Sequence, residues 1–294
     1  MTASSEQPGG VGLVCYRHGD RPTGLRCTRC DRPACPQCLR EASVGHQCVD
    51  CVQQGRRSIR QPVTAAGARP VRQPVLVPAL IAVNVVVFGI TALQARSVIG
   101  NSQAPLFREW ALQPIATAVT GHWWQLFTSG FLHIGPLHLV VNMVSLWIIG
   151  RDLEQVFGRI RFIAIYLVSM VGGGVAVFLL GYPGQAVAGA STALYGLMGC
   201  ILVAMLRLKL NPRQILITIA FNVVISVTLP GISLLGHVGG LVAGTLATIG
   251  IVYAPKDNRS LWQAGSIAAL VVLLSVLFVV RDQQLLEAYC PLGC

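Results

Sequence analysis

The stretch GASTALYG, residues 189–196, places a serine hydroxyl at the head of the apolar run LYGLMGCILVAML. Ser191 stands there among small residues, which commonly serve as packing between membrane helices. The alternative is a nucleophile that works where little water is present. A serine hydroxyl is a weak nucleophile at its own pKa, so this second hypothesis requires a base close to Ser191.

One histidine suits that role. His237 stands in LLGHVGGLVAG, at the head of a later apolar run. An imidazole, with an unperturbed pKa of about 6.5, can accept the serine proton at neutral pH and return it to the leaving amine. The apolar runs contain no Asp or Glu, so we expect a Ser–His dyad. Tyr195 shares a helix face with Ser191 and would stack on the imidazole, although its spacing is equally typical of a packing tyrosine.

A third polar group stands in FLHIGPLHLVVNM. His138 and Asn142 are one helical turn apart and point the same way. Donors of this kind suit an oxyanion hole, which stabilises the negative oxygen of a tetrahedral intermediate. The competing interpretation is a metal site formed by His122, His133 and His138. We favour the oxyanion hole, because no carboxylate accompanies these histidines and the H-E-x-x-H pattern of zinc proteases is absent from the chain.

The composition of the chain indicates whether these residues are surrounded by water or by a lipid bilayer. The chain has 294 residues, 53% hydrophobic and only 11% charged, whereas soluble proteins carry about a quarter charged residues. Seven apolar runs approach the ~20 residues needed to cross hydrocarbon, at about 75–95, 138–150, 162–181, 191–206, 214–229, 237–254 and 262–280. None contains Asp, Glu, Lys or Arg, which argues against the charge relays of pumps and transporters. We therefore expect an all-α polytopic membrane protein.

The charges between the runs predict the orientation. The segment before the first run carries eleven Arg, and alternate connections are basic, through Arg151, Arg159 and Arg161, then Arg207, Lys209 and Arg213, then Lys256 and Arg259. By the positive-inside rule the N-terminus is cytoplasmic and the C-terminus external. The rule also explains the net charge of +11, so we expect no nucleic-acid partner. Cys290 and Cys294 of the external tail are expected to be oxidised or solvent-reactive, and Cys27 and Cys48 are not.

The polar residues of these runs lie at similar depths in the membrane. Ser191 precedes Arg207 by sixteen residues and His237 precedes Lys256 by nineteen. At the rise of an α-helix these residues stand roughly 24 and 28 Å above the inner boundary, and His138 stands roughly 20 Å above it. Ser191 and His237 therefore share a level near the outer surface. Glycines on both spans, among them the pair in GLVAG at 240 and 244, favour close approach of the two helices.

Residues 1–54 are expected to form a separate metal-binding domain. Cysteine and histidine form four pairs with two residues between the members. Each pair can supply two of the four ligands of a tetrahedral zinc ion. Because only four residues separate Cys30 from Cys35, we expect interleaved pairing. One site would use Cys15, His18, Cys35 and Cys38, and the other would use Cys27, Cys30, Cys48 and Cys51.

Two alternatives accompany this prediction. His46 could replace one ligand, although a pair spaced like the other three is simpler. A disulfide knot would suit an oxidising compartment, whereas this domain is expected to face the reducing cytosol. The pattern resembles a B-box-type zinc finger, which implies contact with a protein or lipid partner, because closed zinc sites have no open coordination position. The basic, Pro/Ala-rich segment 55–74 is expected to be a flexible linker along the anionic inner leaflet.

Four stretches together resemble the rhomboid family of intramembrane serine proteases. They are HWWQLFTSGFLHIGPLHLVVNM, GRDLEQVFGRIRF with YLVSMVGGG after it, GASTALYGLMG and GHVGGLVAG. The resemblance implies a six-helix rhomboid core in residues 75–254, with a seventh span and an external tail in 255–294. It also implies that Ser191 is the nucleophile and His237 the base, with His138, Asn142 and the Ser191 amide as oxyanion donors.

Three positions depart from the family's pattern. The residue after the serine is usually Gly and here is Thr192. The usual Trp-Arg pair of the first outer loop reads Trp124-Gln125, and the usual Ala before the histidine is Gly236. Neither presumed catalytic residue is lost.

The expected function is an intramembrane serine endopeptidase of the cell membrane, with two structural zinc ions and no cofactor for catalysis. Its substrates would be single-span or multi-span membrane proteins. A helix in lipid hides its peptide bonds, so cleavage is expected where a substrate span unwinds near its outer end. The alternative is a non-catalytic rhomboid-like protein that binds or escorts membrane proteins through the zinc domain. Loss of Ser191 or His237 would have favoured that alternative.

Overall fold

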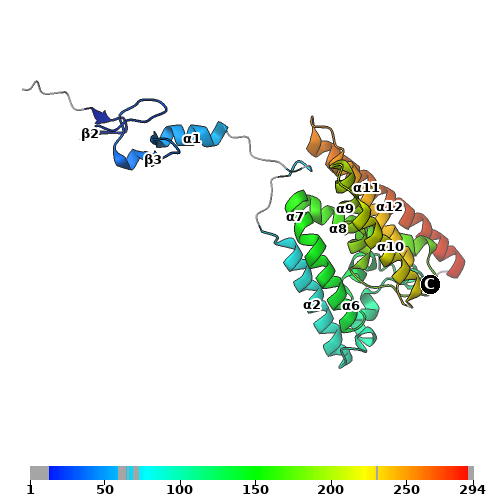
Figure 1. The fold of residues 1–294 in the computed structure, drawn as a ribbon. Helices are drawn as coiled ribbons and strands as arrows, with labels where there is room; N and C mark the ends of the chain where they lie inside the picture. The colour runs from blue at the N-terminus through cyan, green and yellow to red at the C-terminus, as the bar shows by residue number, and fades with distance from the viewer. Residues whose placement is uncertain (1–12, 59–63, 65, 69–72, 230, 291–294) are drawn as a thin grey trace, which may run out of the picture. The chain divides into compact units, whose positions relative to one another are not determined.

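The computed structural model describes residues 13–58, 64, 66–68, 73–229 and 231–290 (Figure 1). The chain divides into two compact units, Met1–Pro62 and Val63–Cys294. The boundary between them lies inside the segment 55–74 that the sequence marks as a linker. Each unit is described by itself.

The N-terminal unit consists of two short β-hairpins and a helix. Its elements are β1 (Val14–Cys15), β2 (His18–Pro22), the 3-10 turn η1 (Pro36–Cys38), β3 (Leu39–Glu41), β4 (His46–Cys48) and α1 (Val49–Ser58). β1 pairs antiparallel with β2, and β3 pairs antiparallel with β4. Six cysteines, Ala34 and Leu39 form its buried interior. So small an apolar core supplies little folding free energy, which is the usual situation of metal-dependent domains.

The second unit consists of helices joined by loops. They are α2 (Leu76–Ala95), η2 (Asn101–Gln103), α3 (Pro105–Trp110), α4 (Pro114–Thr120), α5 (Gln125–Thr128), η3 (Ser129–Phe131), α6 (Gly135–Ser145), a π-helical segment η4 (Leu146–Gly150), α7 (Arg151–Phe157), α8 (Arg159–Leu180), α9 (Ser191–Arg207), α10 (Arg213–Thr228), α11 (Leu234–Val252) and α12 (Arg259–Tyr289). Figure 1 shows the longer of these helices gathered into one bundle.

The apolar runs of the sequence coincide with helices. Among the described residues, four helices are long and apolar enough to cross a membrane: α2, α8, α11 and α12. A fifth candidate is the bent pair Gln125–Phe131 and Gly135–Phe157, and α9 and α10 are shorter apolar helices. The prediction of an all-α polytopic membrane protein with a small N-terminal Cys/His domain is confirmed. By length and composition alone the number of spans is four or five, and the expected seven is reached only when the two shorter helices are included.

Glycines allow the helices α8, α9 and α11 to pack closely. A Cβ added to Gly244 of α11 would overlap Gly196 of α9, and one added to Gly240 would overlap the Thr192 carbonyl. On the opposite side of α11, Gly239 lies against Gly172 and Gly173 of α8. The expected close approach of the two spans that carry Ser191 and His237 is therefore present, and α8 packs against both of them.

Part of the segment expected as a flexible linker is packed against the helical unit. Ala66 is 1% exposed, and its carbonyl accepts a hydrogen bond from Gln263 Nε2 at 3.0 Å. The same Gln263 amide donates to Ile251 O at the end of α11, and its Oε1 accepts from Arg161 Nε. A single buried glutamine thus joins this segment to α8, α11 and α12. At the other end of the chain Cys290 is disulfide-bonded, and Cys294 lies outside the described residues.

Candidate active site and metal clusters

The structure brings Ser191 and His237 into hydrogen-bond contact. Ser191 is the first residue of α9 and His237 lies in the first turn of α11. His237 Nε2 is 2.7 Å from Ser191 Oγ. Tyr195, one turn further along α9, stacks on the imidazole with ring centroids 4.1 Å apart and an interplanar angle of 15°. His237 is 7% exposed and Ser191 is half-buried. The imidazole is therefore largely shielded from solvent, whereas the serine remains partly accessible.

A residue that the sequence did not single out contacts the other side of the imidazole. Ser226, in the last turn of α10, places its Oγ 2.7 Å from His237 Nδ1. The Tyr195 hydroxyl lies 2.9 Å from the same oxygen. A serine within an apolar span carries no pattern that distinguishes it from a packing residue, so sequence reasoning had no signal for Ser226. Only the fold reveals that it faces the histidine.

His138 and Asn142 lie one turn apart on α6, and the His138 ring lies beside Ser191 of α9. The Nδ1 atom of His138 accepts a hydrogen bond from the Ile134 amide at 3.3 Å, which leaves the proton on Nε2. A Cβ added to Gly189 would lie 3.0 Å from His138 Nε2 and 3.5 Å from Ser191 Oγ, so these two atoms border the same space. Asn142 is 4% exposed, and its Nδ2 has no hydrogen-bond partner among the described residues. His138 therefore offers an unused N–H donor beside the serine, and Asn142 offers a second one turn further along α6.

The backbone before Ser191 is fixed by the loop between α2 and α6. Leu112 and Val187 form an antiparallel bridge, with Leu112 N to Val187 O at 3.2 Å and Val187 N to Leu112 O at 2.8 Å. The Gly189 amide then donates to Ser129 O at 2.9 Å. Gly189 has a φ of +134°, which a residue with a side chain rarely adopts. Glycine is needed here both for this conformation and for the space that the His138 ring occupies.

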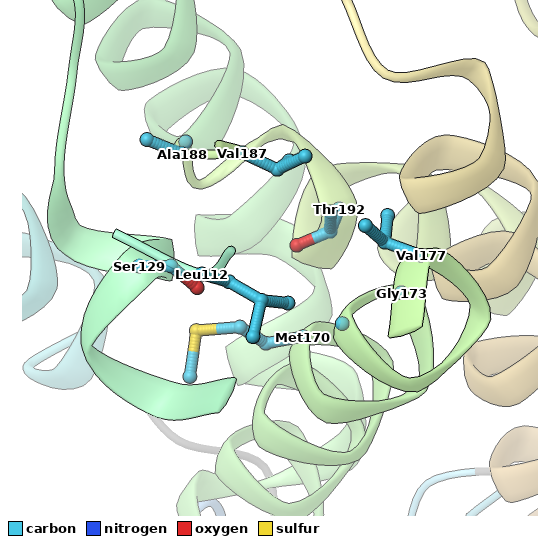
Figure 2. Close-up of a pocket in the computed structure, with 10 residues that line it drawn as sticks. Leu112, Ser129, Met170, Gly173, Val177, Val187, Ala188 and Thr192 are labelled. Carbon is cyan, nitrogen blue, oxygen red and sulfur yellow. The ribbon is translucent and has the colours of Figure 1, made fainter. Parts of the chain in front are cut away.

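Gln125, at one of the three departures from the family's pattern, is an organising residue of the same loop. It is 4% exposed. Its Oε1 accepts from Thr117 Oγ1 at 2.5 Å and its Nε2 donates to Glu109 O at 2.8 Å. The amide thereby joins α5 to α4 and α3 through neutral hydrogen bonds. Next to this loop lies a small pocket whose lining includes Ser129, Gly189 and Thr192 (Figure 2).

The three histidines of the alternative metal site are not gathered around one point. His122 stacks on Trp124, with ring centroids 4.2 Å apart. His133 lies edge-on to His138 at 5.1 Å, and neither of its ring nitrogens has a hydrogen-bond partner among the described residues. Within those residues, groups of three or more metal-ligand atoms occur only in the N-terminal unit.

The N-terminal unit holds two groups of four ligand atoms. One consists of Cys15, His18, Cys35 and Cys38, and the other of Cys27, Cys30, Cys48 and Cys51. All atoms within a group lie within 4.8 Å of one another. These are the interleaved sets expected from the spacing, and His46 belongs to neither. Both groups can hold a metal ion and fit a zinc finger.

The distances within the groups suit tetrahedral coordination. Cys30 Sγ and Cys48 Sγ are 3.8 Å apart, and His18 Nδ1 is 3.4 Å from Cys35 Sγ. Zinc–sulfur bonds of about 2.3 Å in a tetrahedron separate the sulfurs by roughly the same distance. Burial acts to raise the pKa of the Cys15 thiol, but hydrogen bonds from the Cys35, Arg17 and His18 amides lower it to about 6. A thiol that ionises this readily is a good metal ligand.

Comparison with known proteins agrees with this geometry. Residues 120–254 match the Rhomboid domain family model. The chain is 34% identical over 163 residues to "Rhomboid protease GluP" of Bacillus subtilis (strain 168), covering 52% of this chain and 31% of the relative. It is 37% identical over 178 residues to "RHOMBOID-like protein 6, mitochondrial" of Arabidopsis thaliana, covering 58% and 57%. It is 29% identical over 185 residues to "Putative rhomboid protease YdcA" of Bacillus subtilis (strain 168), covering 61% and 89%.

The segment that the family model matches includes the candidate site. The chain spans about a third to just over half of the length of three of the curated relatives that it matches. Two of the relatives described above are named proteases, which supports a protease role in general. The matched segment contains Ser191, His237, His138 and Asn142, and also Ser129 and Val187 of the contacts that fix the backbone before Ser191. Residues 120–254 are therefore a rhomboid domain, carried by a multi-pass membrane protein.

Proposed function

We propose that this protein is an intramembrane serine endopeptidase in which Ser191 is the nucleophile and His237 the general base. The observation that carries this proposal is the distance of 2.7 Å between Ser191 Oγ and His237 Nε2. A general base must lie within such a distance of the proton that it removes. The stacked ring of Tyr195 supports the assignment, because it limits rotation of the imidazole.

The reaction is an acyl transfer in two steps. Ser191 Oγ attacks the carbonyl carbon of a substrate peptide bond while its proton passes to His237 Nε2. When the C–N bond breaks, the imidazolium gives this proton to the leaving amine. A water molecule that loses its proton to His237 then attacks the acyl-enzyme ester. The carboxylic acid product leaves, and the Ser191 hydroxyl regains its proton.

The negative oxygen of each tetrahedral intermediate is stabilised by N–H donors. The first amides of a helix have no partner within the helix, so the Ser191 amide at the start of α9 is suited to this role. The Nε2–H of His138 and the amide of Asn142 supply the side-chain donors. Each is held by the protein before substrate binds, which avoids reorganisation in the transition state.

The substrates are single-span or multi-span membrane proteins, cut near the outer ends of their spans. A peptide bond inside a lipid-embedded helix is hydrogen-bonded and hidden, so the substrate must unwind locally. Residues that disfavour helices, such as glycine, make this easier. The small pocket that Thr192 borders, whose lining includes Gly173, Gly174 and Gly189, favours a small substrate side chain.

The orientation places the site near the outer face of a cell membrane. Arginine and lysine cluster after α7, α9 and α11, at the ends that we assign to the cytoplasm. Ser191 and His237 lie at the opposite ends of α9 and α11. The N-terminal unit is then cytoplasmic, where it holds two structural zinc ions and binds a protein or lipid partner. Catalysis itself uses no metal in this proposal.

The test is covalent labelling of the detergent-solubilised full chain by a fluorophosphonate probe. Wild-type protein should be labelled and should cleave a single-span substrate whose outer end contains Ala, Gly and a helix breaker. Ser191→Ala should do neither, whereas the matched variant Ser266→Ala on α12 should do both. Labelling and cleavage by Ser191→Ala would overturn the nucleophile assignment. Wild-type protein inert towards the probe and a broad substrate panel would favour the non-catalytic escort role.

A further inference from the structure

The Ser226 hydroxyl is surrounded by three hydrogen-bonding groups. Its Oγ lies 2.8 Å from the Asn222 carbonyl oxygen, one turn earlier in α10. It also lies 2.7 Å from His237 Nδ1 and 2.9 Å from the Tyr195 hydroxyl. Ser226 is 5% exposed, so water does not compete strongly for these contacts. Ser226 and Ile215 are the two buried residues of α10, and the other residues of this helix are exposed or half-buried.

The positions of the protons follow from what each group can do. A hydroxyl has one proton to donate and two lone pairs to accept. The Asn222 carbonyl can only accept, so the Ser226 proton points at it. If Ser226 instead donated to His237, two oxygen atoms 2.8 Å apart would face one another without a proton between them. The Ser226 oxygen therefore accepts from His237 Nδ1–H and from the Tyr195 hydroxyl, and all three of its hydrogen-bonding positions are filled.

This arrangement determines the tautomer of His237. A neutral imidazole carries its single proton on one nitrogen and accepts at the other. With the proton held on Nδ1, the Nε2 atom is the acceptor, and Nε2 is the atom 2.7 Å from Ser191 Oγ. The opposite tautomer would direct an N–H at Ser191 and could not remove its proton.

We propose that Ser226 is a positioning residue for the reaction, which holds His237 in the Nδ1–H tautomer so that Nε2 is free to act as the base. The proposal rests on the proposed function, because it concerns the same dyad. It assigns to a neutral hydroxyl the orienting role that a carboxylate has in a Ser–His–Asp triad. A hydroxyl suits this depth better than a carboxylate, because an uncharged group is far cheaper to bury.

The kinetic test compares Ser226→Ala, Ser226→Thr and Thr228→Ala with the wild type. We expect Ser226→Ala to lower kcat on the order of tenfold or more with KM unchanged, because the imidazole loses its preference for the reactive tautomer and the imidazolium loses its hydrogen-bond acceptor at Nδ1. Ser226→Thr restores the hydroxyl and should recover most of kcat. Thr228→Ala is the matched control. The Thr228 hydroxyl bonds to Val224 O at 2.9 Å on the exposed side of the same helix, so its loss should leave kcat unchanged.

A spectroscopic test measures the tautomer without requiring activity. The full chain is labelled with 15N-histidine, and the His237 resonances are assigned by comparison with His237→Gln. The wild type should carry its proton on Nδ1, and Ser226→Ala should show loss of that preference. A wild-type proton on Nε2, or an unchanged tautomer and kcat in Ser226→Ala, would overturn the proposal. Failure of the proposed function would show itself differently, as a wild-type protein that is inert but still holds the Nδ1–H tautomer.

Discussion

The methyl group of Thr192 lies against the space that a side chain at Gly236 would enter. A Cβ added to Gly236 would lie 3.1 Å from Thr192 Cγ2. On the other side, a Cβ added to Gly173 would lie 2.8 Å from Thr192 Cβ. Thr192 and Gly236 are two of the positions at which this chain departs from the family's pattern, where Gly and Ala are usual. The structure indicates that the larger residue at one position is compensated by the smaller residue at the other.

This fit predicts a specific coupling between the two positions. Gly236→Ala should lower both the melting temperature and the cleavage rate, because the new methyl presses on Thr192 and displaces the neighbouring Ser191 and His237. Adding Thr192→Gly should restore much of the loss, with an interaction free energy on the order of 1 kcal/mol. The measurement is a double-mutant cycle by thermal unfolding and substrate cleavage.

The control for this cycle is Gly265→Ala on α12, where an added Cβ meets no atom within 4 Å. That substitution should be neutral or slightly stabilising, since alanine favours a helix more than glycine does. Strictly additive effects of Gly236→Ala and Thr192→Gly would mean that the two departures are independent of one another.

The proposed dyad predicts non-additive losses. Ser191→Ala and His237→Ala should each remove essentially all cleavage, and the double variant should be no worse than either single one, because members of one catalytic unit act together. Turnover of a fluorogenic single-span substrate in detergent measures this, with Tyr195→Phe as a comparison. Phenylalanine retains the stacking surface, so its activity should stay far above that of the other variants. A double variant much slower than both single ones would indicate that Ser191 and His237 act separately.

The oxyanion donors predict partial losses. His138→Ala and Asn142→Ala should each reduce kcat on the order of 10²–10³, which is the usual cost of losing one donor while others remain. The probe reaction of Ser191 should slow in parallel, since the phosphonyl oxygen occupies the same place as the carbonyl oxygen. Val140→Ala, an exposed neighbour on α6, should change neither quantity. Full activity of both His138→Ala and Asn142→Ala would assign the oxyanion hole to other donors.

The sequence predicts those parts of the molecule that are marked by long apolar runs or by a regular spacing of particular residues. Seven apolar runs predict helices at those places, because the requirement for internal backbone hydrogen bonds leaves a lipid-embedded run little choice. The four Cys/His pairs predict an interleaved arrangement, because the short gap between Cys30 and Cys35 favours it. The level shared by Ser191 and His237 follows from counting residues to the basic ends of their spans.

The parts that the sequence does not predict depend on contacts between distant segments. Ser226 contacts His237 only because α10 packs against α11, and nothing in its own apolar run marks it. The burial of Ala66 in a segment that is basic and rich in proline depends on Gln263, almost two hundred residues later. The bend before α6 and the π-helical segment after it reflect local packing of irregular backbone, for which hydropathy carries no signal.

Glu154 is a buried carboxylate outside the candidate active site, and we expect its substitution to lower the stability of the protein strongly. Glu154 is 0% exposed, and its two oxygens accept hydrogen bonds from the amides of Val75, Leu76 and Val77 at 2.8–3.0 Å. It therefore satisfies the free amides at the start of α2, where a negative charge is favourable. Glu154→Gln presents an N–H₂ group to these donors and should lower the free energy of unfolding by about 2 kcal/mol or more.

Thermal unfolding of the full chain in detergent measures this cost. Asp152→Asn is the matched control on the same helix, because the side chain of Asp152 is 70% exposed and its contact with Arg151 is a surface ion pair. Such pairs contribute little to stability, so that control should shift the melting temperature only slightly. Equal shifts for both substitutions would contradict the capping role of Glu154.

The interleaved metal clusters predict a defined stoichiometry. The purified full chain should contain two equivalents of zinc by elemental analysis, and Cys38→Ser or Cys48→Ser should each reduce this to about one, because each removes a ligand from a different cluster. His46→Ala should keep both equivalents, since His46 belongs to neither cluster.

Treatment with a chelator should unfold residues 15–51, because structural zinc supplies on the order of 10 kcal/mol of folding free energy in small domains. Cleavage of a short model substrate should persist under the same treatment, since the proposed dyad uses no metal. Loss of one equivalent in His46→Ala would require a different ligand set, and loss of cleavage on chelation would mean that the metal-binding unit acts directly on the reaction.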